Sequence, residues 1–407
     1  MLSFRDIEAA RVRVRDSLFL TPCAESQTLS RLTGARVWLK LENLQMTGSF
    51  KERGAANRLA TLGPDERAAG VITASAGNHG QALAYHGARL SLSVKVVMPE
   101  GTPLNKVQAT RGFGAEVVLA GATYDDAAEH AERLRAADGR VYVHPFDDEL
   151  VMAGQGTIGL ELLEQNPYVE AVVVPIGGGG LAAGLAVAIK ETNPRIKVYG
   201  VQTAALPSMA RALEAGHPVV VPSAKTIADG IAVKRAGART LEVVRRYVDD
   251  IALVDEEEIA EAILVLLERE KTVAEGAGAV GLAALLARRL PVDGKRVAVV
   301  LSGGNIDVNV VSRIIERGLV KTGRLARTRV VVPDVAGALA GVTRAVAAAG
   351  ANIVEIRHDR AFAEAALGET VIELCLETRG FDHIAEVHAE LAKVGVRPVE
   401  QGRESNR

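Results

Sequence analysis

The chain has 407 residues, of which 48% are hydrophobic and 24% are charged, and its formal net charge is -2 at pH 7. This length predicts two or three domains, and the small net charge gives no electrostatic reason to expect nucleic acid or an anionic membrane as a partner. No apolar run reaches membrane-spanning length, and no secretion signal precedes the first expected helix, residues 3–17, so we expect a cytoplasmic protein.

The body of the chain, residues 36–316, alternates short β-branched runs with longer helical patterns. Nearly continuous apolar strands of this kind are typical of parallel sheets covered by helices on both faces. Ligands of such sheets collect at the carboxyl ends of the strands. The strands are expected at residues 37–42, 70–73, 93–98, 115–119, 171–175, 197–201 and 297–301.

The last eighty residues follow a different pattern. Strands are expected at 328–334, 352–358, 370–378 and 396–400, with helices at 336–349 and 383–394. This βαββαβ order predicts a ferredoxin-like α+β domain. The segment 321–327 is polar and glycine-containing, so we predict a linker there. Of the two cysteines, Cys375 falls within the third of these strands, and we expect it to be a packed core thiol.

One lysine stands at a strand-to-helix turn. Lys51 lies in the run Thr47-Gly48-Ser49-Phe50-Lys51, between the strand 37–42 and a helical pattern. Most lysines are solvated, but an amine presented into a cleft at such a turn can form a Schiff base with a carbonyl. The interpretation of Lys51 as a Schiff-base lysine therefore depends on which residues stand at the other strand ends.

Three strand ends are rich in glycine, at residues 73–80, 175–181 and 301–305. The second carries four consecutive glycines before a helix expected at 182–190, an arrangement that lets backbone N–H groups converge on a phosphate. No Lys-Ser or Lys-Thr follows, so it is not a Walker loop. Glycines that only permit close helix–strand packing are the alternative.

The other two strand ends carry polar side chains. Ser75 can contact a carboxylate and Asn78 a phenolate-like oxygen, whereas His79 is more often a supporting residue than a catalyst. Ser302 can serve as a neutral partner for a ring nitrogen, and its segment is expected to open another helix. Together with the lysine and the glycine turn, these groups describe a pyridoxal phosphate site.

The same segments resemble the threonine ammonia-lyase (threonine dehydratase) branch of the fold-type-II, tryptophan-synthase-β-like pyridoxal phosphate enzymes. The resemblance implies a catalytic domain over residues 1–320 with two parallel-sheet α/β subdomains, the smaller at roughly 50–150. Lys51 would carry the cofactor and act as the catalytic base. The implied cofactor contacts are Lys51, Phe50, Asn78, Gly177, Gly178, Gly179, Gly180, Leu181 and Ser302. The implied substrate contacts are Ser75, Ala76, Gly77, His79 and Glu275.

The resemblance implies a lyase reaction, the β-elimination that converts L-threonine to 2-oxobutanoate and ammonia, as in isoleucine biosynthesis. Related serine racemases carry a second serine where Ala76 stands, so racemisation is not expected. No metal is expected, because Gln202 occupies the place of an acidic ligand. A dehydratase for serine or another β-hydroxy amino acid, a racemase, and a catalytically silent amino-acid-binding protein are the alternatives.

Residues 328–402 resemble an ACT domain, a small regulator of amino-acid enzymes. Gly337 would allow close approach of an amino-acid effector, and Asn352 opens the second strand. A module that only joins subunits is the alternative. We expect a homodimer or homotetramer.

Overall fold

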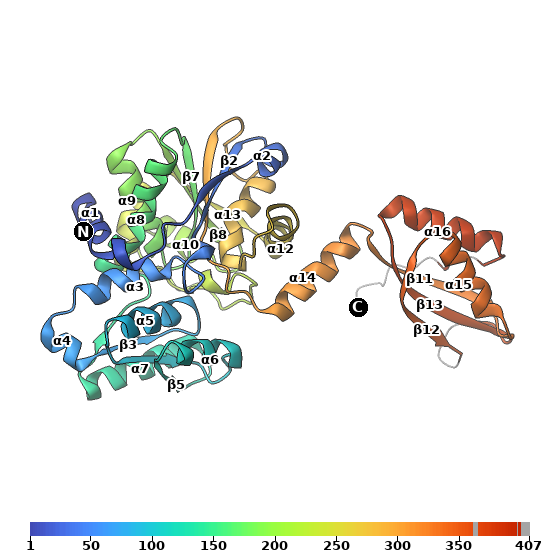
Figure 1. Ribbon diagram of the computed structural model, residues 1–407, viewed down its shortest axis with the longest axis horizontal. Coiled ribbons are helices and arrows are strands. Elements are labelled where there is room, and N and C mark those ends of the chain that lie inside the picture. Colours follow the sequence, from blue (N-terminus) through green and yellow to red (C-terminus); the bar gives the residue numbers. More distant parts are fainter. Residues whose placement is uncertain (361–364, 397, 400–407) are drawn as a thin grey trace. The chain divides into compact units, whose positions relative to one another are not determined.

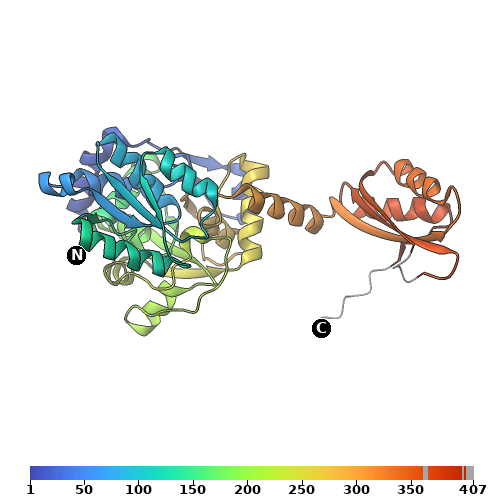
Figure 2. The same ribbon diagram turned by 90° about the horizontal axis from the view of Figure 1, so that it is seen from below.

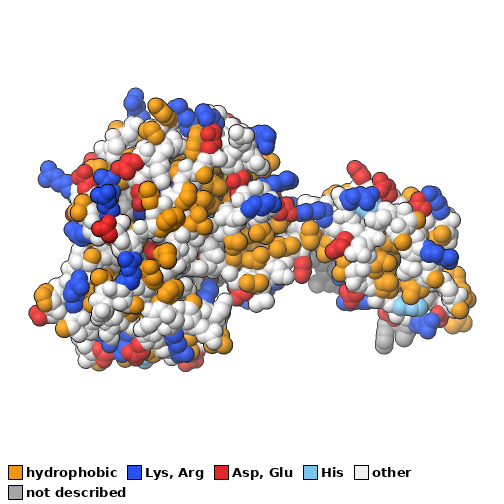
Figure 3. All heavy atoms as spheres, in the orientation of Figure 1, with side chains coloured by type: hydrophobic (Ala, Val, Ile, Leu, Met, Phe, Trp, Pro, Cys, Tyr) orange, Lys and Arg blue, Asp and Glu red, His pale blue; other side chains and the backbone are white. Residues whose placement is uncertain are grey.

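The computed structural model describes residues 1–360, 365–396 and 398–399. The chain forms two compact units, Met1–Asp307 and Val308–Arg407, and each is described by itself. Among the described residues no helix combines the length and apolarity needed to cross a membrane. On the face shown in Figure 3, basic and acidic side chains are interspersed over the first unit.

The first unit contains two sheets rather than one (Figure 1). The larger sheet has the strand order β1-β2-β10-β7-β8-β9, and all of its pairs are parallel except β1 with β2. Helix α13 covers one face and α9, backed by α8, covers the other. The strands are β1 (Cys23–Ser26), β2 (Arg36–Leu41), β7 (Ala171–Pro175), β8 (Lys197–Thr203), β9 (Asp250–Val254) and β10 (Arg296–Leu301).

The smaller sheet is entirely parallel, in the order β5-β4-β3-β6. Its side chains alternate between two apolar clusters, because successive residues of a strand point to opposite faces. Val96 and Met98 pack in the cluster that includes α5 residues, whereas Val97 packs with residues of α7. The strands are β3 (Val71–Ala74), β4 (Val94–Met98), β5 (Glu116–Leu119) and β6 (Val141–Tyr142). Figure 2 shows the first unit from below, and the helices around the smaller sheet can be followed there by their blue to green colours.

Two helices of the first unit, α1 and α9, start within two residues of the positions expected from the sequence. The α-helices of the unit are α1 (Phe4–Val14), α2 (Gln27–Thr33), α3 (Lys51–Ala60), α4 (Pro64–Ala69), α5 (Asn78–Arg89), α6 (Leu104–Gly112), α7 (Tyr124–Asp138), α8 (Glu149–Gln165), α9 (Gly180–Thr192), α10 (Ser208–Ala215), α11 (Ala238–Tyr247), α12 (Glu256–Val265) and α13 (Gly276–Leu286). Short 3-10 turns follow β2 (η2, Glu42–Leu44) and precede α11 (η3, Asp229–Ile231).

The second unit is an antiparallel sheet with helices against one face, and its strand order β12-β13-β11-β14 is that of a ferredoxin-like βαββαβ unit. Its core combines valines of β11 with Ile372 and Leu374 of β13 and Val387 of α16. The elements are α14 (Val308–Lys321), β11 (Leu325–Pro333), α15 (Ala338–Ala348), β12 (Asn352–Asp359), β13 (Glu369–Glu377), α16 (Phe381–Lys393) and β14 (Pro398–Val399).

Four expectations differ from the structure. The first compact unit ends at Asp307 rather than at residue 320, because α14 belongs to the second unit. The segment 321–327 is no irregular linker, since α14 ends at Lys321 and β11 begins at Leu325. Cys375 is only half-buried, because it alternates with the core residues Leu374 and Leu376 and so points to the other face of the sheet. The glycine-rich end after β10 does not open a helix directly, because α14 starts only at Val308. The expected end of the last strand, Glu400, and of the domain, residue 402, lie outside the described residues.

A buried charge cluster joins β2, α3 and α8. Arg53 and Lys40 are fully buried, and between them they contact the carboxylates of Glu42 and Glu161. The Arg53 guanidinium donates five hydrogen bonds of 2.6–3.0 Å, to these two carboxylates and to Thr157. Lys40 Nζ donates three, of 2.7–2.9 Å. Two positive and two negative charges therefore neutralise one another with every N–H group used.

Replacement of Arg53 by leucine should leave Glu42 and Glu161 buried with too few donors. We expect the free energy of unfolding to fall by about 3–5 kcal/mol, measured by urea unfolding of the cofactor-free protein. Arg11→Leu is the matched control, because the Arg11–Glu164 pair is exposed and should cost no more than about 1 kcal/mol. Equal effects of the two substitutions would contradict the role of the cluster.

Candidate active site

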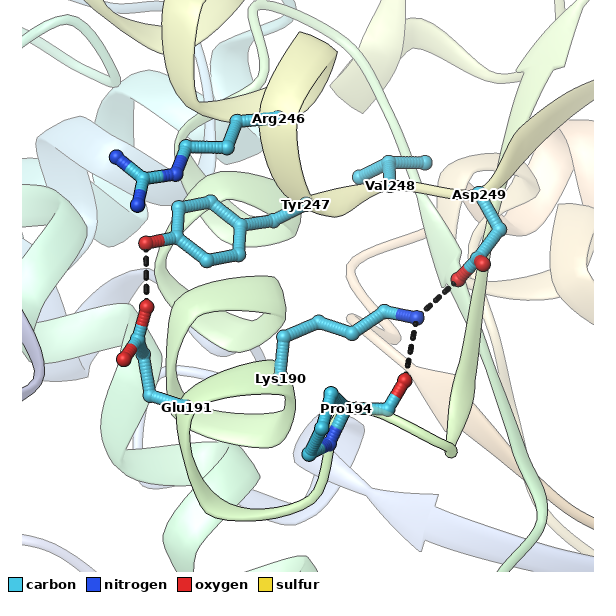
Figure 4. Close-up of a pocket in the computed structure, with 7 residues that line it drawn as sticks. All are labelled: Lys190, Glu191, Pro194, Arg246, Tyr247, Val248 and Asp249. Atoms are coloured by element: carbon cyan, nitrogen blue, oxygen red, sulfur yellow. Dashed lines mark hydrogen bonds and ion pairs between the residues drawn. The ribbon is translucent and has the colours of Figure 1, made fainter.

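A cavity of about 930 Å³ opens at the carboxyl ends of β3, β7 and β10, and so lies between the two sheets. Every residue expected from the sequence to bind cofactor or substrate lines it, from Phe50 and Lys51 through the segment 75–79 and the glycine turn to Glu275 and Ser302. A second, shallower hollow lies beside α9 and α11 (Figure 4). There Lys190 lies 2.6 Å from Asp249, and Tyr247 donates to Glu191 at 2.5 Å. Because these polar groups already bond to one another, the first cavity is the candidate site.

Lys51 is the first residue of α3 and faces the cavity. The chain reaches it through a turn that is tied to the end of β10, where Phe50 N donates to Ser302 O at 2.9 Å. Lys51 Nζ donates to the carbonyl of Pro145 at 2.7 Å and lies 5.2 Å from the centre of the Phe50 ring. Burial lowers the pKa of Lys51 to about 8, although the negative charge of Glu275 acts in the opposite direction. The amine is therefore partly neutral, and nucleophilic, near neutral pH.

A chain of amides connects the glycine-rich strand ends after β3 and β10 with Glu275 and with the turn that carries Lys51. Asn78 Nδ2 donates to Glu275 Oε1 at 2.8 Å, and Asn78 Oδ1 accepts from Asn305 Nδ2 at 2.8 Å. Asn305 Nδ2 also donates to Thr47 O at 2.7 Å, beside the lysine turn. Burial, and then the charge of Asp229, raise the pKa of Glu275 to about 7 even though Asn78 stabilises its carboxylate. Glu275 can therefore hold a proton near neutral pH.

The four consecutive glycines form a tight turn into α9. Gly179 has φ +101° and is followed by Gly180 as the first residue of the helix, with no side chain capping its N–H groups. A Cβ at Gly178 would lie 2.4 Å from the Phe146 ring, and one at Gly179 would lie 2.5 Å from Met209. Close packing thus also requires the glycines, so the alternative considered from the sequence is partly correct. It does not compete with phosphate binding, because the uncapped N–H groups remain.

The strand end after β3 carries two supporting side chains. Ser75 Oγ accepts hydrogen bonds from Gly77 N at 3.3 Å and Gly80 N at 3.1 Å, and its hydroxyl donates only a long 3.5 Å bond to Gly77 O, which a ligand can replace. His79 is buried, and its Nε2 lies 3.0 Å from the carbonyl of Val143. Burial and the charge of Lys51 lower the pKa of His79 to about 3. The imidazole is therefore neutral, as expected of a supporting residue rather than an acid.

Several cavity residues escaped the sequence interpretation. Asn305 was visible, since it ends the third glycine-rich segment. Pro145 contributes a backbone carbonyl, for which no side-chain signal exists. Phe146 packs beneath Gly178 and Gly180, and His144 stacks edge-to-face on Phe146 at 4.5 Å. The contacts of Pro145 with Lys51 and of Phe146 with the glycines join segments far apart in the chain, so spacing could not reveal them.

The site fits pyridoxal phosphate in its own geometry. The uncapped first turn of α9 offers N–H groups and a helix dipole to a phosphate. Lys51 offers a partly neutral amine. Ser302, which is buried, makes only a long 3.4 Å contact with Ala277 O and so keeps a hydroxyl available. The fold and the site therefore define a lysine-dependent enzyme built for a phosphate-bearing aldehyde.

Comparison with known proteins agrees with a pyridoxal phosphate site. Residues 14–303 match the family described as pyridoxal-phosphate dependent enzyme, and the chain belongs to this family, with the fold-type-II architecture. It is 49% identical over 395 residues to an L-threonine ammonia-lyase of Thermotoga maritima, covering 97% of this chain and 98% of that protein. It is 50% identical over 396 residues to an L-threonine ammonia-lyase of Geobacter sulfurreducens, with the same coverage of both chains. The structure of maize serine racemase is 31% identical, with a TM-score of 0.74 over 79% of this chain and 98% of that one.

The reactivity of Lys51 should follow its lowered pKa. In the cofactor-free protein, acylation of Lys51, measured by mass spectrometry over a pH series, should reach half its maximal rate near pH 8, against about 10.4 for an ordinary lysine. Glu275→Gln should move this midpoint lower still, because it removes the negative charge that favours the protonated amine. A midpoint at or above pH 10, or an upward shift in the variant, would contradict the electrostatic description.

Proposed function

We propose that this chain is an L-threonine ammonia-lyase that converts L-threonine to 2-oxobutanoate and ammonia by β-elimination, with L-serine as a second substrate. The two L-threonine ammonia-lyases at 49% and 50% identity over 97% of the chain support this substrate class. The choice of elimination over racemisation rests on one observation: the site offers a single base for Cα, because Lys51 is the one cavity lysine for which the described residues provide no ion pair, and position 76 is an alanine. The other two lysines that line the cavity, Lys106 and Lys234, are paired with Asp229 and Asp125.

Different residues of the cavity would bind the cofactor and the substrate. When bound, pyridoxal phosphate supplies an aldehyde for the substrate amine and a ring that withdraws electrons from Cα. The glycine turn that leads into α9, from Gly177 to Leu181, would hold the phosphate, with Phe50 and Asn78 against the ring and Ser302 at its nitrogen. The substrate carboxylate would bind to the hydroxyl of Ser75 and to the segment that leads into α5, with Ala76, Gly77 and His79.

Lys51 Nζ would accept the proton of Cα after leaving the carbonyl of Pro145. Glu275 lies on the Asn78 side of the cavity, and its raised pKa lets it hold and return a proton during loss of the hydroxyl. Ala76 carries no hydroxyl, so it cannot return a proton to the opposite face of Cα. This arrangement favours elimination over racemisation, although a serine racemase shares the fold.

Activity measurements test this proposal directly. Purified enzyme with pyridoxal phosphate should release 2-oxobutanoate from L-threonine and form little D-threonine. Lys51→Ala should lower the rate by about 10³-fold or more, because it removes the base. A panel of β-hydroxy amino acids, assayed for 2-oxo acid and for D-isomer, provides the measurement. Equal rates of racemisation and elimination, or a clear preference for 3-hydroxyaspartate, would refute the assignment.

The second unit is proposed to act as an ACT domain that senses an amino acid. Its βαββαβ order supports this assignment, as does Gly337, which caps α15 with φ +94° and has no atom within 4 Å of the position of a Cβ. Asn352 Nδ2 donates to Glu377 at 2.8 Å on the sheet. Open space at a left-handed glycine suits the approach of a ligand to the backbone. We further propose that the chain works as a homodimer or homotetramer.

The effector proposal predicts a change in rate when branched-chain amino acids, serine or threonine are added to the full-length enzyme at fixed substrate. Gly337→Ala should weaken this response and leave the basal rate unchanged, because an alanine is strained at φ +94°. Steady-state kinetics over an effector series measures both. Absence of any response in the unsubstituted enzyme would leave the second unit as a structural module.

A further inference from the structure

Asp147 connects the two halves of the first unit, and it directly follows Pro145 and Phe146, which line the cavity. It follows the smaller-sheet strand β6 by five residues, and its carboxylate reaches the start of α11, beside the larger sheet. Oδ1 accepts from Arg239 N at 3.0 Å and Thr240 N at 3.1 Å, and Oδ2 accepts from Ala238 N at 3.2 Å. The residue that precedes α11, Gly237, provides no side-chain cap. Asp147 therefore caps this helix from 91 to 93 residues away in the chain.

The start of α11 also holds the glycine turn, residues 177–180. Thr240 Oγ1 donates to Gly178 O at 2.6 Å, and Gly237 N donates to the same carbonyl at 3.3 Å. A Cβ at Gly237 would lie 2.4 Å from Asp147 Oδ1, so the carboxylate fills the space beside this glycine. The position of Gly178 is thus set by a turn that Asp147 completes.

The neighbours of Asp147 contact the same site. Phe146 packs against the glycine turn, where it fills the space that side chains at Gly178 and Gly180 would need. Pro145 O accepts the hydrogen bond of Lys51 Nζ. Three consecutive residues, 145–147, therefore contact Lys51, the glycine turn and the start of α11, respectively.

We propose that Asp147 is a positioning residue for the cofactor. By capping α11 it fixes the Thr240–Gly178 contact, and so sets the phosphate-binding turn relative to Lys51. A carboxylate suits this role, because its hydrogen bonds to the N–H groups are charge-assisted and its charge complements the positive end of the helix. The proposal rests on the pyridoxal phosphate site and not on which amino acid is the substrate.

The test measures the affinity of the full-length, cofactor-free protein for pyridoxal phosphate, by the absorbance of the bound form, together with its unfolding midpoint in urea. Asp147→Ala should raise the Kd on the order of tenfold, the factor expected for loss of a helix cap. Asp147→Asn keeps an acceptor oxygen and should restore most of the affinity. Asp148→Ala is the matched control: Asp148 caps α8 through Leu150 N and Val151 N, so this variant should lower the unfolding midpoint but keep the Kd within about twofold.

Thr240→Val tests the same connection without altering the carboxylate. It should also raise the Kd, and the double variant with Asp147→Ala should show less than the product of the two single effects, because both act through Gly178. If Asp147→Ala fails to fold, Thr240→Val and Asp147→Asn still decide. An unchanged Kd in folded Thr240→Val, or equal Kd values for Asp147→Ala and Asp148→Ala, would overturn the proposal. A wrong substrate assignment would show differently, as normal cofactor binding with no 2-oxobutanoate.

Discussion

The buried charge cluster around Arg53 is the constraint on which the site depends. Lys51, Glu52 and Arg53 are consecutive, and each is committed to a different partner. Arg53 is locked to Glu42 and Glu161 inside the protein, and Glu52 accepts from Thr47 N and lies 3.3 Å from His86 Nε2 of α5. With its two neighbours held inside, the first turn of α3 can present Lys51 only to the cavity. Burial of two charge pairs carries a large desolvation penalty. The cluster therefore adds little net stability, but it fixes a single orientation of α3.

The second feature is a balance of proton affinities across the cavity. Burial moves the amine of Lys51 down toward neutrality and the carboxyl of Glu275 up toward it. Both groups can therefore exchange protons near pH 7, as acid–base chemistry at a carbon atom requires. The neutral His79 takes no part in this exchange, and the amides of Asn78 and Asn305 hold the carboxyl in place without changing their own charge.

The parts of the site that local chemistry specifies were predictable. These parts are motifs that a few neighbouring residues define: a lysine between a strand and a helix, four glycines before α9, and polar residues after β3 and β10. The linker at 321–327 and the helix after Ser302 were not, because a polar, glycine-containing stretch is equally compatible with a helix end, a turn and the start of a strand. Cys375 shows the same limit, since a one-residue change of register decides which face of a strand it occupies.

By itself the sequence determined the class of chemistry, the two kinds of sheet and the glycine-rich strand ends that meet at the cavity, because strand ends in parallel sheets converge whatever the connecting segments do. Only the tertiary structure decided which groups form hydrogen bonds with the site residues. That the carbonyl of Pro145 receives Lys51, that Asn305 supports Asn78, and that Asp147 caps a helix some ninety residues away are contacts between segments distant in the chain. Such contacts use backbone groups and side chains with no local signature, and they exist only once the two sheets have packed against each other.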